Sequence, residues 1–235
     1  PYTTLFRSRR FQAMKIIARM HNDFDSKFGI PRQSNVVQEL KGRIVFEPEY
    51  RNEAALRGIE GFDYLWLIWQ FSEAVRDKWS PTVRPPILGG NTRVGVFATR
   101  SPFRPNAIGL SSVKLEKVEL HTPEGPVLHI SGADLMNGTP ILDIKPYLAY
   151  VDSHPEAAQG FRGQGWNRKL QVNFPPELLV KIPPEKQAGL LGVLENDPRP
   201  TYQEDAQRIY GMSFGGQEIK FQVSDGILQV VAIEG

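Results

Sequence analysis

The chain is organised around an irregular stretch, RPPILGGNTRVGVFATRSPFRPNAIGLS, which spans residues 84–111. Proline and glycine recur along it. Proline fixes φ and lacks an N–H donor, whereas glycine permits positive φ, so neither a helix nor a long strand is expected here. Only residues 94–98 have the composition of a strand. We therefore predict a long loop built from short extended pieces.

This loop lies in a positively charged part of the sequence. Between residues 78 and 114 there are six cations and no Asp or Glu, and the cations are Lys78, Arg84, Arg93, Arg100, Arg104 and Lys114. A surface loop whose arginines are solvated, or paired with carboxylates from elsewhere, would have this composition. So would a rigid loop that presents guanidinium groups to a carboxylate or phosphate. Three arginine-containing turns in succession favour the second interpretation.

The segments on either side of the loop have the patterns of β-strands. Residues 62–71, FDYLWLIWQF, are apolar almost throughout, which is typical of a strand buried on both faces. We interpret Trp66 and Trp69 in this strand as core residues. Residues 108–120 alternate between apolar and polar side chains, as a half-buried strand does.

Further strands are expected on both sides of these segments. They fall at residues 15–20, 127–133 and 141–144, with a bent strand or hairpin around Gly42 in residues 36–47. One helical turn is expected at residues 53–57, closed by Gly58 in the left-handed conformation. Many short strands and little helix predict a mainly β protein. Closure into a small antiparallel barrel would remove the exposed strand edges.

The chain divides into four parts. Residues 1–13 precede Met14 and show no apolar periodicity, so we interpret them as a disordered or non-native lead-in, with a basic RNA-contacting arm as the alternative. Residues 14–150 would form the barrel domain. Residues 151–174, rich in Gly, Gln and Asn, are expected to be a loop or linker. Residues 175–235 would form a small α+β domain that packs on the barrel or on a second subunit. Within it we expect a helix at 185–194 and strands at 208–214, 218–223 and 228–233.

Composition excludes several kinds of chemistry. The sequence has no Cys, which excludes disulfides, thiolate zinc sites and cysteine nucleophiles. Its four His have no metal-ligand spacing, so we expect no metal. No apolar run is long enough to cross a membrane and no secretion signal is visible, so we expect a cytoplasmic protein.

Several stretches, in the same order along the chain, resemble the TsaA-like family of tRNA methyltransferases, also called TrmO. They are PRQ at residues 31–33, residues 58–66 and 79–83, the loop at 84–111, DLMNGTPILDIKPY at 134–147, and DPRP with a tyrosine two residues later at 197–202. The resemblance covers residues 15–235. It implies a single-sheeted β-barrel of the class VIII type of methyltransferase, with S-adenosylmethionine (SAM) as cofactor, tRNA as partner and a homodimeric state. The implied reaction is methylation of N6 of N6-threonylcarbamoyladenosine beside the anticodon.

The resemblance also implies which residues bind the cofactor. The family's contacts fall on Pro31, Arg32, Gln33, Ser72, Glu73, Arg100, Leu110, Asp134, Leu135, Met136 and Asn137. Among these, Arg100 would bind the methionine carboxylate and Asp134 would accept hydrogen bonds from ribose hydroxyls or the amino group. Leu110 and Leu135 would form an apolar shelf for adenine. Ser72-Glu73 replaces a frequent His-Gln, and Asn137 replaces a frequent Asp. Both changes keep hydrogen-bonding capacity.

The expected substrate contacts are Arg104, Asp197, Arg199 and Tyr202, with Phe103 and Tyr202 able to stack on bases. For residues 197–200 a rigid turn is the alternative. The methyl group of SAM is already activated by the sulfonium, so catalysis would be mainly positioning, and we assign no catalytic residue. Two other functions stay open. One is methylation of another substrate by the same fold, and the other is RNA binding by a non-catalytic barrel.

Overall fold

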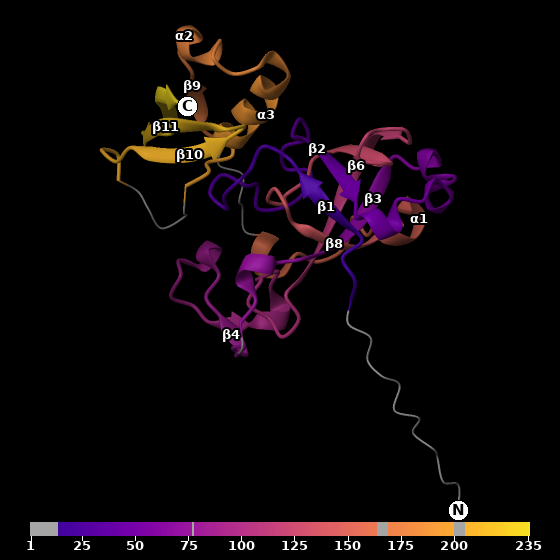
Figure 1. Cartoon of the computed structure of the whole chain (residues 1–235). Helices are drawn as coiled ribbons and strands as arrows, with labels where there is room; N and C mark the ends of the chain where they lie inside the picture. The colour runs from indigo at the N-terminus through magenta and orange to yellow at the C-terminus, as the bar shows by residue number, and fades with distance from the viewer. Residues whose placement is uncertain (1–13, 77, 164–168, 200–204) are drawn as a thin grey trace, which may run out of the picture.

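The computed structural model describes residues 14–76, 78–163, 169–199 and 205–235. The predicted lead-in at 1–13 and Tyr202 lie outside the described residues. Six strands form a closed antiparallel barrel in the order β1-β2-β7-β6-β3-β8, which confirms the predicted fold (Figure 1). The strands are β1 Ala18–His21, β2 Lys41–Phe46, β3 Tyr64–Gln70, β6 Ile108–Glu119, β7 Val127–Ser131 and β8 Pro140–Pro146.

The apolar strand β3 buries one face in the barrel. Leu65, Leu67 and Trp69 point inward and are buried, whereas the alternate residues are only half-buried. The expectation that both faces are buried is therefore wrong, because the outer face of the barrel lies towards solvent. Trp66 is partly covered there, since its indole N–H donates to Asp152 Oδ2 at 2.9 Å from the short helix α1, Ala149–Asp152.

Two predicted strands are shorter than expected. β2 begins at Lys41 and has no turn at Gly42, which lies inside the strand. A Cβ at Gly42 would meet the side chain of Met20 at 2.3 Å, so close packing explains the glycine at this position. Within the long loop only β5, Val94–Gly95, is a strand, and it pairs with β4, Thr82–Val83. The turn closed by Gly58, with φ 88°, is confirmed. The 3-10 turns are Pro48–Tyr50, Glu53–Leu56, Ile59–Gly61, Ser72–Ala74, Pro86–Leu88, Val96–Ala98 and Gly160–Gly163.

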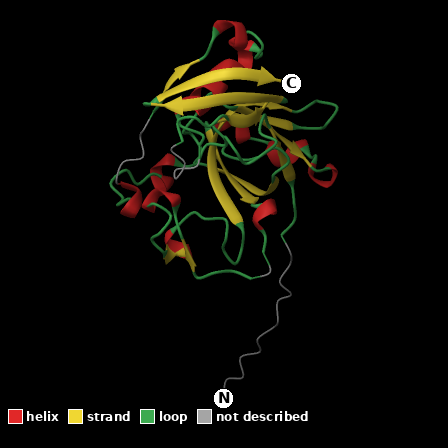
Figure 2. Cartoon of the chain, turned by 90° about the vertical axis from the view of Figure 1, so that its left-hand side faces the viewer, coloured by secondary structure: helices red, strands yellow, loops and turns green. Residues whose placement is uncertain are grey.

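The C-terminal part combines two helices with a four-stranded sheet of order β10-β11-β12-β9 (Figure 2). The expected helix and three strands are confirmed. The elements are α2 Pro176–Leu179, α3 Pro184–Glu195, β10 Tyr210–Phe214, β11 Gln217–Ser224 and β12 Ile227–Glu234. β9, Gln171–Asn173, was expected as loop but pairs parallel with β12. The reason is tertiary, since Val172 of this strand and Leu170 just before it pack into the core of this part.

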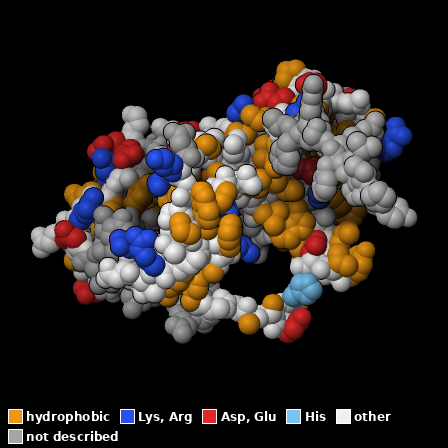
Figure 3. All heavy atoms as spheres, turned by 90° about the horizontal axis from the view of Figure 1, so that it is seen from below, with side chains coloured by type: hydrophobic (Ala, Val, Ile, Leu, Met, Phe, Trp, Pro, Cys, Tyr) orange, Lys and Arg blue, Asp and Glu red, His pale blue; other side chains and the backbone are white. Residues whose placement is uncertain are grey.

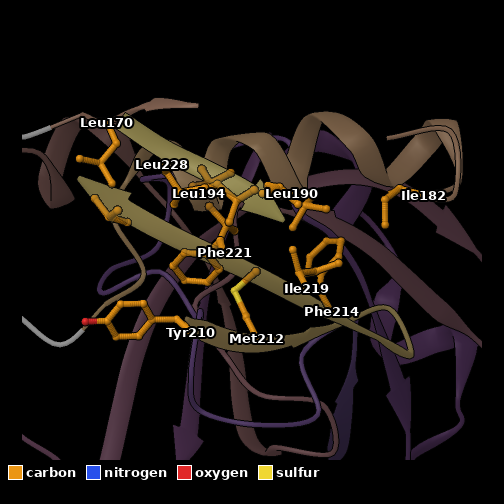
Figure 4. Packing of buried hydrophobic residues seen from close by; sticks show 14 of the residues in the cluster. Leu170, Ile182, Leu190, Leu194, Tyr210, Met212, Phe214, Ile219, Phe221 and Leu228 are labelled. Atoms are coloured by element: carbon orange, nitrogen blue, oxygen red, sulfur yellow. The ribbon is translucent and has the colours of Figure 1, made fainter. Parts of the chain in front are cut away.

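That core also contains residues from the connection between β1 and β2. Leu190 and Leu194 of α3 face Ile219 and Phe221 of β11 (Figure 4), and the same cluster includes Phe24, Val37 and Leu40. The barrel interior is a separate cluster. The C-terminal part thus packs on the barrel domain through residues 22–40, one of the two arrangements expected.

Close packing at this contact requires small residues in α3. A Cβ on Gly192 would lie 2.6 Å from Val37 Cγ1, and one on Gly189 would lie 3.1 Å from Leu40 Cδ2. Polar contacts add to the apolar ones. Gly215 N–H donates to the carbonyl of Asp23 at 2.8 Å, and Lys186 Nζ lies 2.6 Å from Asp23 Oδ1.

Candidate functional site

A cleft of about 970 Å³ opens where β3 ends and β6 begins. Its walls come from four parts of the chain: the barrel rim, the loop around Arg100, residues 30–34, and the connection between β7 and β8. The volume is at the upper end of the range typical for small-molecule and cofactor sites. Because the contributing segments are far apart in sequence, the cleft exists only in the folded chain.

Most of the residues expected at the site line this cleft. They are Pro31, Arg32, Gln33, Ser72, Glu73, Arg100, Arg104, Leu110, Asp134 and Met136. The PRQ motif, the loop around Arg100 and the motif that begins at Asp134 therefore meet at one place in the folded chain, whereas residues 79–83 and 197–199 do not line the cleft.

Two expected cofactor residues do not present their side chains to the cleft. Leu135 is 1% exposed and belongs to the barrel core, so the shelf expected from Leu110 and Leu135 does not form. Asp134 and Met136 line the cleft on either side of it, as alternation along an extended segment requires. Asn137 does not line the cleft. Its amide donates to Asp25 Oδ1 at 2.9 Å and its Oδ1 accepts from the backbone N–H of Asn22 at 3.3 Å.

The expected substrate residues Asp197 and Arg199 bind each other. Arg199 donates through Nε and Nη2 to the two carboxylate oxygens of Asp197, both at 2.8 Å. These hydrogen bonds are the main reason why the pKa of Arg199 is raised. Asp197 itself has φ 50°, in the left-handed region that turns often use. This segment touches the cleft indirectly, because Arg32 Nη2 donates to the carbonyl of Arg199 at 3.2 Å.

A hydrogen-bonded chain holds the carboxylate of Asp134. Trp69 Nε1 donates to Ser111 Oγ at 3.0 Å, and Ser111 Oγ donates to Asp134 Oδ1 at 2.6 Å. Burial raises the pKa of Asp134, while the bond from Ser111, backbone N–H groups and the charge of Arg100 act in the opposite direction. The result is an oriented acceptor in a partly desolvated position.

This arrangement depends on a glycine across the sheet. Gly109 on β6 is opposite Trp69 on β3, and a Cβ there would lie 2.2 Å from the indole ring. Trp69 and Ser111 were not expected at the site. The signal available was that a buried indole needs an acceptor for its N–H, and Ser111 is a polar residue in a buried strand.

Arg100 is an exposed cation at the cleft. One of its guanidinium nitrogens donates to Gln33 Oε1, and the amide of Gln33 donates to the carbonyl of Arg32. Among the described residues, no carboxylate oxygen lies within 4.0 Å of Arg100 as an ion pair. An oriented guanidinium without a paired carboxylate is suited to bind a ligand carboxylate.

Two further charged groups contribute differently. Arg104 Nη1 donates to the carbonyls of Thr99 and Ser101 at 3.1 and 3.3 Å, so it braces its own loop while it lines the cleft. Glu73 lies 2.9 Å from Lys27 Nζ, but both side chains are more than half exposed, so this pair adds little stability.

The described residues contain no group of three or more His, Cys, Asp or Glu placed to hold a metal ion. Of the helices described, none is long and apolar enough to span a membrane.

The fold and the cleft together define a class of protein. It is a small closed antiparallel barrel whose rim carries an oriented guanidinium, a half-buried carboxylate and apolar side chains, as a ligand with charged, polar and aromatic parts requires.

Comparison with known proteins places the chain within this class. The model of the tRNA-methyltransferase O N-terminal domain matches residues 19–153, and that of the TrmO C-terminal domain matches residues 167–235. The chain belongs to the TrmO family. This confirms the family resemblance of the sequence motifs.

Relatives match over most of their length. The chain is 36% identical over 226 residues to a tRNA (adenine(37)-N6)-methyltransferase of Escherichia coli K12, covering 93% of this chain and 96% of that protein. It is 44% identical over 178 residues to a protein of the same name from Eikenella corrodens, covering 74% and 99%. A crystal structure of TrmO from Pseudomonas aeruginosa superposes with a TM-score of 0.76 at 28% identity, covering 95% of this chain and 99% of that one.

Proposed function

We propose that this protein transfers a methyl group from SAM to N6 of adenine 37 of tRNA, as the names of its relatives indicate for them. We further propose that this adenine carries a threonylcarbamoyl group. The observation that carries the proposal is that the PRQ motif, the loop around Arg100 and the motif that begins at Asp134 line one cleft, with a guanidinium, a carboxylate and apolar side chains that complement SAM. Action on tRNA implies a cytoplasmic site of action, and we propose a homodimer, measurable by light scattering.

The residues of the cleft fit SAM. Arg100 would bind the methionine carboxylate, and Asp134 would accept hydrogen bonds from the ribose hydroxyls or the amino group. Leu110, 56% exposed, and Met136 provide apolar surface for adenine without Leu135. The two positive charges of the cofactor would be attracted by the carboxylates of Asp134 and Glu73. SAM supplies a methyl group activated by its sulfonium, so these residues act by binding and orientation.

The acceptor side requires recognition of a modified adenosine. The threonylcarbamoyl group ends in a carboxylate. Arg104 donates to the loop carbonyls of Thr99 and Ser101 through Nη1, and its other N–H groups would bind this carboxylate. The N6 nitrogen is conjugated to the purine and to a carbonyl, so its lone pair is a poor nucleophile. A guanidinium near the carbonyl would stabilise the negative charge that forms as N6 loses its proton.

The first test is calorimetric titration with SAM and with its demethylated product. Replacing Arg100 with Ala should weaken SAM binding by about tenfold or more, because a charge-assisted hydrogen bond is lost. Arg100→Lys keeps the charge but loses the planar fork, so an intermediate affinity is expected. Arg57→Ala, an exposed arginine before the start of β3, is the matched control. Unchanged affinity of Arg100→Ala would contradict the assigned role.

The second test is methyl transfer from labelled SAM to tRNA with and without the threonylcarbamoyl modification. The proposed substrate predicts transfer to the modified tRNA alone. Transfer to unmodified tRNA would favour another substrate for the same fold. RNA binding that does not depend on SAM, with no transfer to either tRNA, would favour a non-catalytic barrel.

A further inference from the structure

The segment between β3 and β6, of which residues 71–76 and 78–107 are described, forms a surface that we call the loop lobe. It is ordered by its own contacts, because β4 pairs with β5 and the N–H of Val96 donates to the carbonyl of Pro81 at 2.9 Å. Val96 is buried and anchors the lobe. Side chains on its outside are therefore presented from a defined backbone.

Aromatic rings are exposed on this lobe. Phe97 is 71% exposed, Trp79 50% and Phe103 38%, although large aromatic side chains are usually mostly buried. The rings of Trp79 and Phe97 are 6.0 Å apart, and the guanidinium carbon of Arg104 lies 6.0 Å from the Phe97 ring. Phe103 and Arg104 also line the cleft. A series of rings and guanidinium groups thus leads from the cleft onto the outside of the lobe.

The same lobe carries several exposed cations. Arg76, Lys78, Arg84 and Arg93 are exposed, and none is within 4.0 Å of a carboxylate oxygen among the described residues. On the barrel, by contrast, exposed cations such as Lys41, Arg43 and Lys117 pair with glutamates. Figure 3, seen from below, shows hydrophobic side chains next to Lys and Arg on this side of the molecule.

Exposed aromatic rings among exposed cations match single-stranded RNA, whose bases stack on rings while cations contact the phosphates. We infer that the loop lobe binds unpaired nucleotides beside the one in the cleft, with Trp79 and Phe97 as the stacking platform. This inference rests on the proposed function. A second copy of the chain is a less suitable occupant. In a two-fold symmetric contact the same patch lies on both sides, so one cationic surface would meet another cationic surface.

Fluorescence anisotropy with an anticodon stem-loop RNA carrying the modified adenosine tests the inference. The double variant Trp79→Ala/Phe97→Ala should bind this RNA at least about tenfold more weakly, as expected for the loss of base stacking. Its SAM affinity by calorimetry and its thermal unfolding should match the wild type. Val180→Ala, also an exposed apolar residue but in the C-terminal part, is the control and should bind the RNA normally.

Salt dependence gives an independent readout. Arg84→Ala should reduce the slope of log affinity against log salt by roughly one, as expected for the loss of a phosphate contact. Lys117→Ala removes the same charge from the far end of β6 and should leave the slope unchanged.

The outcomes separate the inference from the proposed function. If the double variant binds and is methylated like the wild type, the inference is wrong while the proposed function stands. Conversion of a dimer to a monomer by the double variant would assign this surface to a second copy and overturn the inference. If the wild type neither binds nor methylates the RNA, both fail.

Discussion

Asp134 combines a role in the cleft with a cost to the fold. Burial raises its pKa, so the folded chain holds the carboxyl proton to a higher pH than the unfolded chain does. Between the ordinary Asp pKa of about 3.9 and the raised value, stability therefore falls as pH increases. Above that window the full cost is present, and below about pH 3.9 it is absent.

Replacing Asp134 with Asn should remove this cost while an amide oxygen still accepts from Ser111. We expect a higher melting temperature than the wild type at pH 7, a difference that vanishes near pH 3.5, about where the wild-type carboxyl is protonated in both states. Thermal unfolding across pH measures this, with Asp225→Asn in an exposed turn as control. SAM affinity should fall, as is common where function and stability conflict. A variant less stable than the wild type at pH 7 would contradict the explanation.

The position of a residue at the cleft was predictable for most residues that belong to a family motif. Arg100 and Asp134 line the cleft as expected, and so do most of the others. Leu135 and Asn137 share the same motif but turn away from it, because alternation and neighbouring partners decide where each side chain points. Tyr202 as a substrate contact stays a prediction.

The pairing of β3 with β6 connects the barrel to the cleft. Gly109→Ala should force the Trp69 ring away and lower stability by about 1–3 kcal/mol, the usual cost of overpacking. SAM affinity should fall as well, since the ring would no longer hold Ser111 and Asp134 in place. Chemical denaturation and calorimetry measure the two effects.

Gly95→Ala is a matched control for this change. Gly95 has φ −58°, and a Cβ there meets nothing within 4 Å. It should change neither property by more than a few tenths of a kcal/mol. Equal effects of the two substitutions would show that the Trp69 contact is not what makes Gly109 important.

Two elements, β6 and α3, match their expected ranges within a residue or two. Alternation along β6 is visible locally, whereas α3 has no clear apolar period and its packed side includes Gly189. β9 was missed because three residues show no period, and only pairing with β12 makes them a strand. A bent strand or a hairpin was expected around Gly42, and the hairpin is wrong because Gly42 lies inside β2; a glycine within a strand and one at a turn look the same in sequence.

The contact between α3 and residues 22–40 makes the two parts of the molecule one structure. Pro31, Arg32 and Gln33 belong to this connection, whose apolar residues are buried in the C-terminal core. Gly192→Ala should gain about 1 kcal/mol of helix propensity but lose more by displacing Val37. We expect lower stability together with weaker SAM binding, measured by thermal unfolding and calorimetry.

Gly189→Ala offers the comparison, because the atom nearest to its Cβ would be Leu40 Cδ2 at 3.1 Å, the end of a flexible side chain, and the backbone carbonyl of Glu39 would lie at 3.4 Å. A smaller loss, or a gain, is expected. If Gly192→Ala lowers stability without changing SAM affinity, the C-terminal part does not position the cofactor loop.

The sequence by itself determined the family, the barrel class and most of the cofactor residues that line the cleft, because periodicity and literal motifs are local properties of a chain. The tertiary structure decided three contacts that the spacing of residues does not predict. Trp69 and Ser111 hold Asp134 through hydrogen bonds, and Arg199 pairs with Asp197. Apolar residues within 22–40 pack into the C-terminal core. These contacts join residues on separate strands and domains. Strand register and packing bring them together, and both are set only when the whole chain folds.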